Sequence, residues 1–176
     1  MKPLNGQKVI FLDRDGIINK KANEHDYIKS WDQFVFIEGI AEAIKTFNEN
    51  GFKVVVVTNQ RGIALGMMNA EDVELIHNKM ITDLEKKKAM IYRVIYCPHE
   101  NAQCQCRKPE IGMFLKAEEE FLIDRENSFM IGDSDSDMQA GRKYGVKSIF
   151  VGNGQSESAD FRCKNLREVV DLIIRG

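Results

Sequence analysis

Four side chains that bind soft metal ions lie close together in the middle of the chain. They form the pattern C-x-H-x4-C-x-C, which runs from Cys97 through His99 and Cys104 to Cys106. Three thiolates and one neutral imidazole make a complete tetrahedral ligand set for structural zinc. A disulfide is disfavoured because Cys104 and Cys106 are too close in sequence for an unstrained bridge. These residues predict a closed zinc site, and reduced thiols in a solvated loop are the alternative.

Acidic, hydroxyl and amide side chains follow three apolar runs of the sequence, at 8–12, 53–57 and 128–131. Each run is short and rich in β-branched or aromatic residues, which is typical of strands covered on both faces. If these strands lie parallel in one sheet, their carboxyl ends share the edge at which ligands bind. The side chains expected there are Asp13 and Asp15, then Thr58, Asn59 and Gln60, and then Asp133 and Asp137.

The crowding of at least three carboxylates at one edge requires a compensating cation. A hard divalent ion is the natural choice, and magnesium suits a site that is shared with phosphate. Asp13 would then attack phosphorus as a nucleophile, and Asp15 would act as general acid and base. Thr58 would offer its hydroxyl and N–H groups to a phosphoryl oxygen, and Lys108 would balance the developing negative charge. This combination predicts phosphoryl-transfer chemistry.

The elements that must position these residues alternate between strands and helices. Two further apolar runs, at 92–96 and 147–151, bring the predicted strands to five. This alternation indicates an α/β fold, a doubly wound parallel sheet with helices on both faces, as in Rossmann-like domains. No repeat or linker divides the sequence, so we expect a single domain over residues 1–176. The predicted helices cover 40–47 with Gly51 just beyond, 70–84 with a cap at Asn69, 114–121, 138–144 with Gly145 just beyond, and 166–173 with a cap at Asn165.

The overall composition restricts the class of partner. The chain is 43% hydrophobic and 30% charged with a formal net charge of -2, which gives no electrostatic reason to bind nucleic acid or an anionic membrane. No apolar run approaches the length of about 18 residues that a membrane span needs. The N-terminal sequence also lacks the pattern of a signal peptide. We therefore expect a cytoplasmic monomer that acts on a small molecule.

Four segments resemble the sequential motifs of the haloacid-dehalogenase superfamily of phosphatases. They are "FLDRDG", "VVTNQ", "CRKP" and "MIGDSDSDMQAG", and the resemblance extends from about Lys8 to Val151. It implies that Asp13 is the nucleophile and Asp15 the acid/base residue. The other implied roles are magnesium binding by Asp13, the Asp15 carbonyl group and Asp133, phosphate binding by Thr58, Asn59 and Lys108, and support of the site by Asp137, which would orient Lys108 or a metal-bound water.

The segments "FLDRDGIIN", "TNQRGIALG" and "CPHENAQCQCRKPEIGM" resemble, more narrowly, the zinc-containing branch of this superfamily. That branch holds D-glycero-D-manno-heptose 1,7-bisphosphate phosphatases and histidinol phosphatases. "TNQRGIALG" and "KPEIGM" favour the heptose bisphosphate 7-phosphatase activity. The spacing of four residues between His99 and Cys104 is more similar to the histidinol branch, so histidinol phosphate or another small sugar phosphate is the alternative substrate.

The spacing of the motifs leaves no room for a large cap domain, so loops are expected to select the substrate. These loops are 20–31, 61–68 and the zinc-binding loop. Arg61 and Arg107 are candidates for binding a second anionic group because each adjoins a motif. Gln60 and Tyr27 are the further candidates for substrate binding. Outside this set, Lys20, Lys21 and His25 are interpreted as solvated loop residues and His77 as a structural residue.

A closed four-ligand site leaves no position for substrate, so the zinc is predicted to be structural. It would fix the loop that presents Arg107 and Lys108 to phosphate. A non-hydrolytic phospho-receiver or binding module is the alternative from another functional class, because receivers also carry acids, a Thr and a Lys at strand ends. Receivers are usually shorter, and they lack the second Asp of the D-x-D pattern and the zinc loop. Magnesium-dependent hydrolysis of an aryl phosphate would distinguish the two classes.

Overall fold

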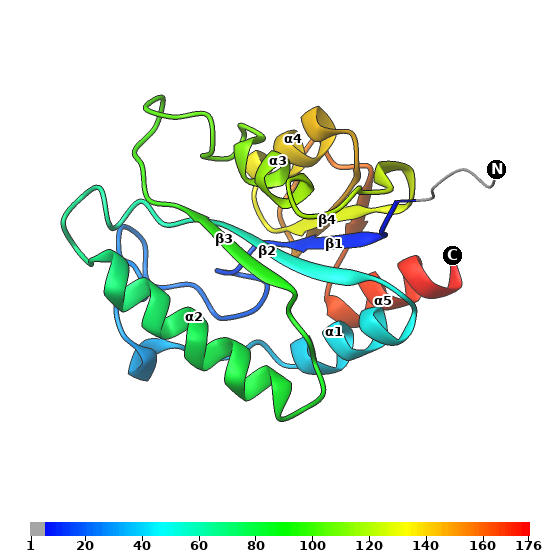
Figure 1. The fold of residues 1–176 in the computed structure, drawn as a ribbon, viewed down its shortest axis with the longest axis horizontal. Helices are drawn as coiled ribbons and strands as arrows, with labels where there is room; N and C mark the ends of the chain where they lie inside the picture. Colours follow the sequence, from blue (N-terminus) through cyan, green and yellow to red (C-terminus); the bar gives the residue numbers. More distant parts are fainter. Residues whose placement is uncertain (1–5) are drawn as a thin grey trace.

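The computed structural model describes residues 6–176, which form a parallel six-stranded sheet between two layers of helices (Figure 1). The order across the sheet is β3-β2-β1-β4-β5-β6, and every neighbouring pair is parallel. The predicted doubly wound sheet is therefore confirmed. The strands are β1 (Val9–Leu12), β2 (Lys53–Asn59), β3 (Arg93–Cys97), β4 (Phe129–Gly132), β5 (Lys147–Val151) and β6 (Phe161–Cys163).

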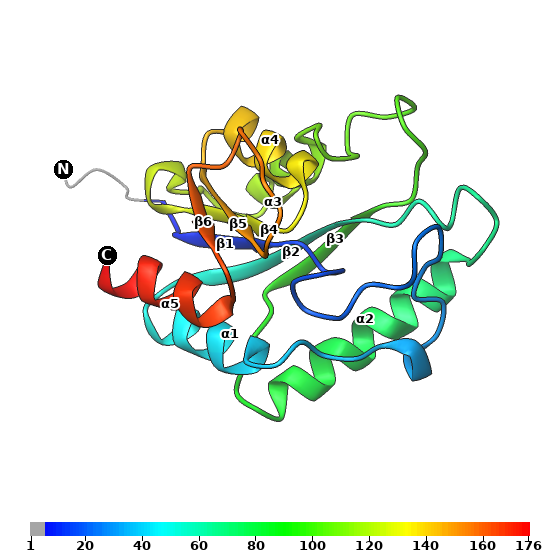
Figure 2. The same cartoon turned by 180° about the vertical axis from the view of Figure 1, so that it is seen from behind.

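Alternate side chains of each strand enter two separate hydrophobic cores. In β1, Ile10 and Leu12 lie in one core, while Val9 and Phe11 lie in the other. Both faces are apolar because helices cover both (Figures 1 and 2). The first face packs against α1 (Ile40–Glu49), α2 (Ala70–Glu85) and α5 (Leu166–Arg175), and the second against α3 (Gly112–Glu118) and α4 (Asp135–Tyr144).

The helix ends follow the sequence signals closely. Asn69 caps α2 by accepting a hydrogen bond from the Asp72 N–H group at 2.9 Å, and Asn165 caps α5 in the same way. Gly51 and Gly145 have φ angles of 82° and 96°, so both predicted terminal glycines are confirmed. The prediction missed β6 because that strand has only three residues, of which Cys163 alone is buried. It also missed the short 3-10 helices Trp31–Gln33 and Arg125–Asn127.

The order of the strands fixes where a ligand can bind. From β1 the chain builds the sheet outward through β2 and β3, and it then returns to the other side of β1 as β4. The carboxyl ends of β1 and β4 therefore lie beside a topological switch point, which is the usual ligand crevice of such sheets. The Asp13 and Asp133 motifs follow these two strands directly.

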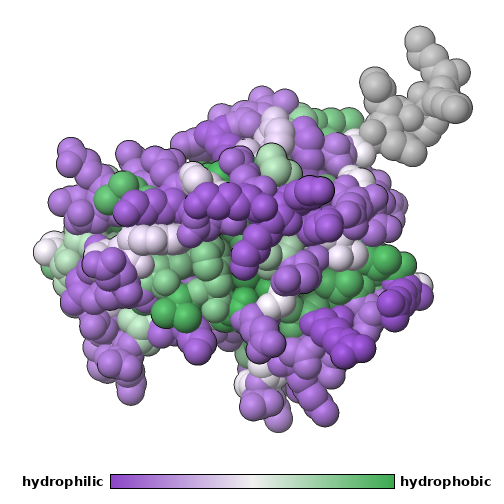
Figure 3. Space-filling model, turned by 90° about the horizontal axis from the view of Figure 1, so that it is seen from below, coloured by the Kyte–Doolittle hydropathy of each residue, from purple (hydrophilic) through white to green (hydrophobic). Residues whose placement is uncertain are grey.

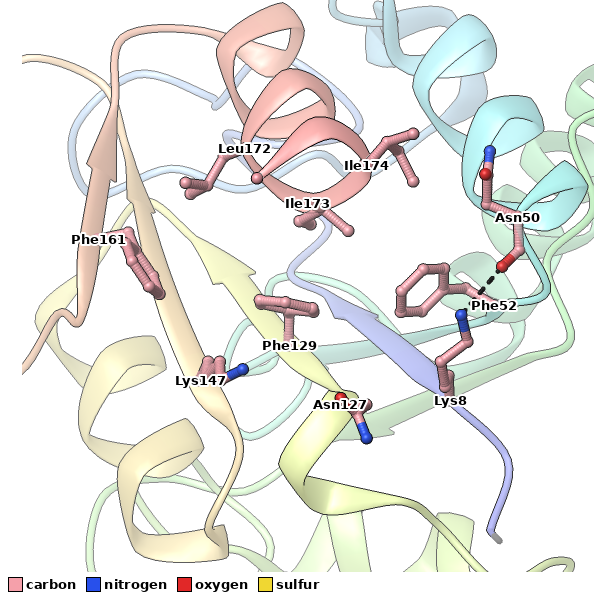
Figure 4. Close-up of a pocket in the computed structure, with 11 residues that line it drawn as sticks. Lys8, Asn50, Phe52, Asn127, Phe129, Lys147, Phe161, Leu172, Ile173 and Ile174 are labelled. Atoms are coloured by element: carbon pink, nitrogen blue, oxygen red, sulfur yellow. Dashed lines mark hydrogen bonds between the residues drawn. The ribbon is translucent and has the colours of Figure 1, made fainter.

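A cavity of about 420 Å³ lies at the opposite edge of the sheet (Figure 4). Its lining includes Phe129 and Lys147 at the starts of their strands, with Ile173 of α5 above them. None of the motif residues lines this cavity. It is therefore separate from the edge that carries the predicted site residues.

The layer of α1, α2 and α5 presents a largely hydrophilic surface crossed by a band of hydrophobic residues (Figure 3). Within residues 6–176, none of the helices combines the length and apolarity needed to cross a membrane. No large cap domain interrupts these described residues, since the segment between β1 and α1 contains only one 3-10 helix and loops.

Candidate active site

Lys108 joins the carboxylates of two distant motifs. Its Nζ atom lies 3.0 Å from Asp13 Oδ1 and 2.7 Å from Asp137 Oδ1, and it donates to the Val57 carbonyl oxygen at 2.7 Å. Lys108 and Asp137 are buried, and 13% of the Asp13 side chain is exposed. Burial lowers the pKa of Lys108, but the Asp13 and Asp137 carboxylates outweigh it and raise the pKa above its usual value. Lys108 is therefore a fixed cation beside the candidate nucleophile.

The Asp137 carboxylate also connects this ion pair to the start of α4. Its Oδ2 atom accepts hydrogen bonds from the Ser134 hydroxyl at 2.7 Å and from the Ser134 N–H group at 3.2 Å. Ser134 in turn caps the helix, so a capping box and the Lys108 ion pair share one carboxylate. Gly132 makes this approach possible, since a Cβ atom there would lie 2.3 Å from Asp137 Oδ2.

Asp15 is held in place by four hydrogen bonds. Arg14 donates to its Oδ1 atom at 2.9 Å and 3.2 Å, and Asn19 donates to the same atom at 2.9 Å. Gln60 donates to Oδ2 at 3.0 Å. Although burial raises the pKa of Asp15, the Arg14 guanidinium and these hydrogen bonds lower it below the usual value. The site therefore holds Asp15 as an oriented carboxylate.

The side chains at the end of β2 hold Lys108 and Asp15 by hydrogen bonds. The Asn59 amide accepts from the Lys108 N–H group at 3.0 Å and donates to the Lys108 carbonyl oxygen at 3.1 Å. Gln60 donates to Thr58 Oγ1 at 2.9 Å as well as to Asp15. Thr58 itself is fully buried. The amide groups of Asn59 and Gln60 are thus engaged with Lys108, Thr58 and Asp15.

The acidic cluster fits a divalent cation. Asp13, Asp133 and Asp137 each offer a carboxylate oxygen within 4.8 Å of the others. The Asp133 Oδ1 atom is buried and has no hydrogen-bond partner among residues 6–176. A buried, unpaired carboxylate oxygen carries a large desolvation cost unless a cation approaches it. The oxygen-only ligand set is the kind that magnesium prefers.

The pKa of Asp13 reports the same crowding. Burial and the neighbouring Asp137 carboxylate raise it from 3.8 to about 7, against the opposing effect of Lys108. One buried ammonium group is thus too little positive charge for these carboxylates. Additional positive charge at the cluster would return Asp13 to the ionised form that a nucleophile requires.

The four predicted zinc ligands converge at the end of β3. The Sγ atoms of Cys97, Cys104 and Cys106 lie 3.1–3.5 Å apart, and His99 Nδ1 lies 3.3 Å from Cys106 Sγ. All three cysteines are free, and all four ligand atoms lie within 4.8 Å of one another. The Arg107 N–H group points at Cys104 Sγ at 3.3 Å, as expected for a thiolate. This donor set can hold a structural zinc ion.

Arg107 and Arg61 turn toward the zinc loop rather than toward Asp13. Arg107 donates to Asn101 Oδ1 at 2.7 Å, and Arg61 pairs with Glu100 at 2.6 Å. Tyr27 contacts the 61–68 loop, since a Cβ atom on Gly62 would lie 3.0 Å from its ring. The three loops expected to select the substrate therefore contact one another beside the catalytic edge.

The sequence interpretation missed three residues near the acids. Arg14 is fully buried, and its guanidinium lies 3.1 Å from His77 Nε2 as well as against Asp15. Burial lowers the pKa of His77 to about 3, so it is a neutral acceptor, in keeping with its predicted structural role. Asn19 donates a hydrogen bond to Asp15, and the only sequence signal for this contact is that Asn19 lies four residues after Asp15. Lys21 is an exposed loop residue as interpreted, but its Nζ atom also lies 2.7 Å from Asp133 Oδ2, a contact that the sequence did not indicate.

The whole chain is similar to known phosphatases. A sequence profile of the HAD-hydrolase-like family matches residues 105–173. The D-glycero-alpha-D-manno-heptose-1,7-bisphosphate 7-phosphatase of Campylobacter jejuni is 37% identical over 94% of this chain and 95% of its own. The D-glycero-beta-D-manno-heptose-1,7-bisphosphate 7-phosphatase of Helicobacter pylori is also 37% identical, over 97% of this chain and 99% of its own.

Solved structures support the same relationship. D,D-heptose 1,7-bisphosphate phosphatase from B. bronchiseptica, complexed with magnesium and phosphate, superposes with a TM-score of 0.84 at 28% identity. The match covers 96% of this chain and 98% of that one. The D,D-heptose 1,7-bisphosphate phosphatase from Burkholderia thailandensis gives a TM-score of 0.69 at 30% identity, covering 96% of this chain and 99% of that one.

Proposed function

The chain belongs to the family of heptose-1,7-bisphosphate 7-phosphatases, which are haloacid-dehalogenase-like hydrolases, and on this premise we propose that it removes the 7-phosphate of D-glycero-D-manno-heptose 1,7-bisphosphate. The family relationship confirms the expected phosphatase class and weighs against a non-hydrolytic receiver. The observation that carries the proposal is Asp13, a carboxylate held beside a buried ammonium group and two further acids.

Two steps describe the proposed reaction at the level of atoms. A carboxylate oxygen of Asp13 attacks phosphorus, and the bond from phosphorus to the sugar oxygen breaks. Asp15, which must take up a proton when the substrate binds because it is ionised in the free site, gives that proton to the sugar oxygen. Asp15 then takes a proton from a water molecule that attacks the aspartyl phosphate. The bond between phosphorus and Asp13 breaks, and inorganic phosphate leaves. Arg14, Asn19 and Gln60 orient the Asp15 carboxylate through hydrogen bonds to both of its oxygens.

Magnesium is the cofactor that we propose for this site, with Asp13, Asp133 and the Asp15 carbonyl group as ligands. Bound there, it would neutralise the carboxylates and the charge on the transferred phosphoryl group. Lys108 supplies the second positive charge from its buried position. Asp137 and the Asn59 amide fix the direction of the Lys108 side chain and main chain respectively.

Zinc at the cysteine cluster would affect the phosphate site without contacting the substrate. We propose that Cys97, His99, Cys104 and Cys106 bind one structural zinc ion that fixes the loop leading into Lys108. The backbone supports this role, because the Gln60 N–H group donates to the Cys97 carbonyl oxygen at 2.8 Å. The end of β2 and the zinc loop are thereby joined.

Substrate binding is proposed for the loops around the mouth of the site. Asn59 and Gln60 would act chiefly by positioning Lys108 and Asp15, with Thr58 offering its hydroxyl and N–H groups to an oxygen of the phosphoryl group. We propose that Arg61, Arg107 and Tyr27, which belong to these loops, bind a second phosphate of the substrate. A bisphosphate would need such additional cations, whereas histidinol phosphate would not.

Phosphate release from purified protein tests the substrate. The substrates would be both anomers of heptose 1,7-bisphosphate, histidinol phosphate and simple sugar phosphates, each with and without magnesium. We expect magnesium-dependent release from a heptose bisphosphate with the highest kcat/KM. A higher kcat/KM for histidinol phosphate would contradict the assignment.

A further inference from the structure

Lys21 pairs with the candidate magnesium ligand Asp133. Its ammonium nitrogen lies 2.7 Å from Asp133 Oδ2, leaving the buried Oδ1 atom without a hydrogen-bond partner in the described part of the chain. Lys21 comes from the loop after β1, and Asp133 from the end of β4. The loop therefore delivers a cation to an acid that follows a different strand.

The local backbone holds Lys21 close to this position. The Gly16 N–H group donates to the Asn19 carbonyl oxygen at 2.7 Å, and the Lys20 N–H group donates to the Val35 carbonyl oxygen at 2.8 Å. Gly16 has a φ of 93°, and a Cβ atom on it would lie 2.0 Å from Asp133 Oδ2 and 2.8 Å from Lys21 Cε. The absence of a side chain at Gly16 thus makes room for the pair.

The charges at the site explain why a second ammonium group is needed. The buried Lys108 pairs with both Asp13 and Asp137, and Asp133 pairs with Lys21 instead. A divalent cation that binds the same carboxylate would repel the ammonium group, since like charges at such short range disfavour each other. The Lys21 side chain is 54% exposed, so it can move into water at little cost.

We propose that Lys21 is a resident counter-ion of Asp133 that magnesium must displace, a role that rests on the magnesium site of the proposed function. The pair slightly stabilises the metal-free site, and it also weakens magnesium binding by the free energy of displacing the ammonium group. Once displaced, Lys21 remains tethered at the mouth of the site by its loop. The loop sequence thus sets the magnesium concentration that the enzyme requires.

The test is magnesium binding by calorimetry without substrate, using the full chain purified with its zinc. Lys21→Met should bind magnesium about tenfold more tightly than the wild-type protein. Lys21→Arg retains the charge and should stay close to the wild-type affinity. Lys20→Met is the matched control, because Lys20 is an exposed neighbour without an ion-pair partner among the described residues, and its affinity should not change.

Thermal unfolding in a magnesium-free buffer gives an independent readout. Lys21→Met should lower Tm by about 2 °C, because Asp133 loses its partner. Unchanged or weaker magnesium binding by Lys21→Met would overturn the proposal, as would an equal gain in Lys20→Met. Neither readout involves the sugar, so a protein that fails on heptose bisphosphate but shows the predicted affinities would contradict the proposed function alone.

Discussion

Replacing Asp137 by asparagine should weaken both the ion pair and the start of α4. One Asp137 oxygen lies 2.7 Å from Lys108 Nζ, and the other accepts from the hydroxyl and N–H groups of Ser134. An asparagine side chain has only one acceptor oxygen, so in either orientation its NH2 group must face a donor, either the Lys108 ammonium group or Ser134. The side chain is 1% exposed, so water cannot compensate.

The size of the effect follows from the partners that remain. Removing one member of a buried ion pair costs about 3–5 kcal/mol. Lys108 keeps Asp13 at 3.0 Å and the Val57 carbonyl oxygen at 2.7 Å, so the loss belongs at the lower end of that range. We expect the free energy of unfolding to fall by about 3 kcal/mol, which corresponds to a decrease in Tm of about 6–12 °C for a domain of this size.

Urea unfolding of magnesium-free Asp137→Asn measures this loss directly. Asp135→Asn is the matched control, because it removes an exposed carboxylate from the first turn of the same helix. Its free energy of unfolding should change by less than about 1 kcal/mol. Equal effects of the two substitutions would refute the reasoning, since they would show that Lys108 does not depend on Asp137.

Three further substitutions test separate parts of the site. Asp13→Asn should abolish turnover, and it should also stabilise the magnesium-free protein at about pH 8 by up to about 4 kcal/mol, measured by urea unfolding, with the difference disappearing toward about pH 4. The sign follows because the pKa of Asp13 rises from 3.8 to about 7 on folding. Between these pH values the folded wild-type protein holds a proton that the unfolded chain has lost, so its stability falls as the pH rises through this range. A less stable variant at high pH would show that Lys108 compensates the charge fully. Asp15→Asn should reduce kcat for a sugar phosphate by about 10²-fold or more. It should spare phosphoenzyme formation from an aryl phosphate, whose leaving group needs no proton. Rapid-quench kinetics with both substrates measure the two effects, and equal losses would contradict the acid role of Asp15. Cys106→Ser should lower the zinc content, measured by elemental analysis, and it should reduce kcat in a way that added magnesium does not restore. Unaltered kinetics in a zinc-depleted protein would show that the zinc is irrelevant to catalysis.

The main features of the fold could be predicted because each central strand is apolar on both faces. The boundaries were less accurate where polar side chains extend a strand. Thr58 and Asn59 belong to β2 because their backbones pair with Tyr96 and Cys97 of β3. Hydrophobic pattern alone ends that strand at 57. The helix predicted from 138 begins at Asp135, because Ser134 caps it.

The contacts that connect the motifs could not be predicted, because they depend on the path of loops. Arg14 would be expected at the surface, yet it is fully buried between Asp15 and His77. Lys21 reaches Asp133 only because the chain folds back after Gly16. Spacing in the sequence identifies the reactive side chains, and the structure is needed to show what positions them.

The central claim is that Asp13 carries the phosphoryl group during turnover. Rapid quenching during a single turnover of heptose 1,7-bisphosphate, followed by mass spectrometry of the peptide that contains Asp13, tests it most directly. We predict a transient phosphoryl adduct on Asp13 that forms and decays at rates consistent with kcat, and none in Asp13→Asn. Release of phosphate by the wild-type protein without any adduct on Asp13, or with the adduct on another residue, would contradict the claim.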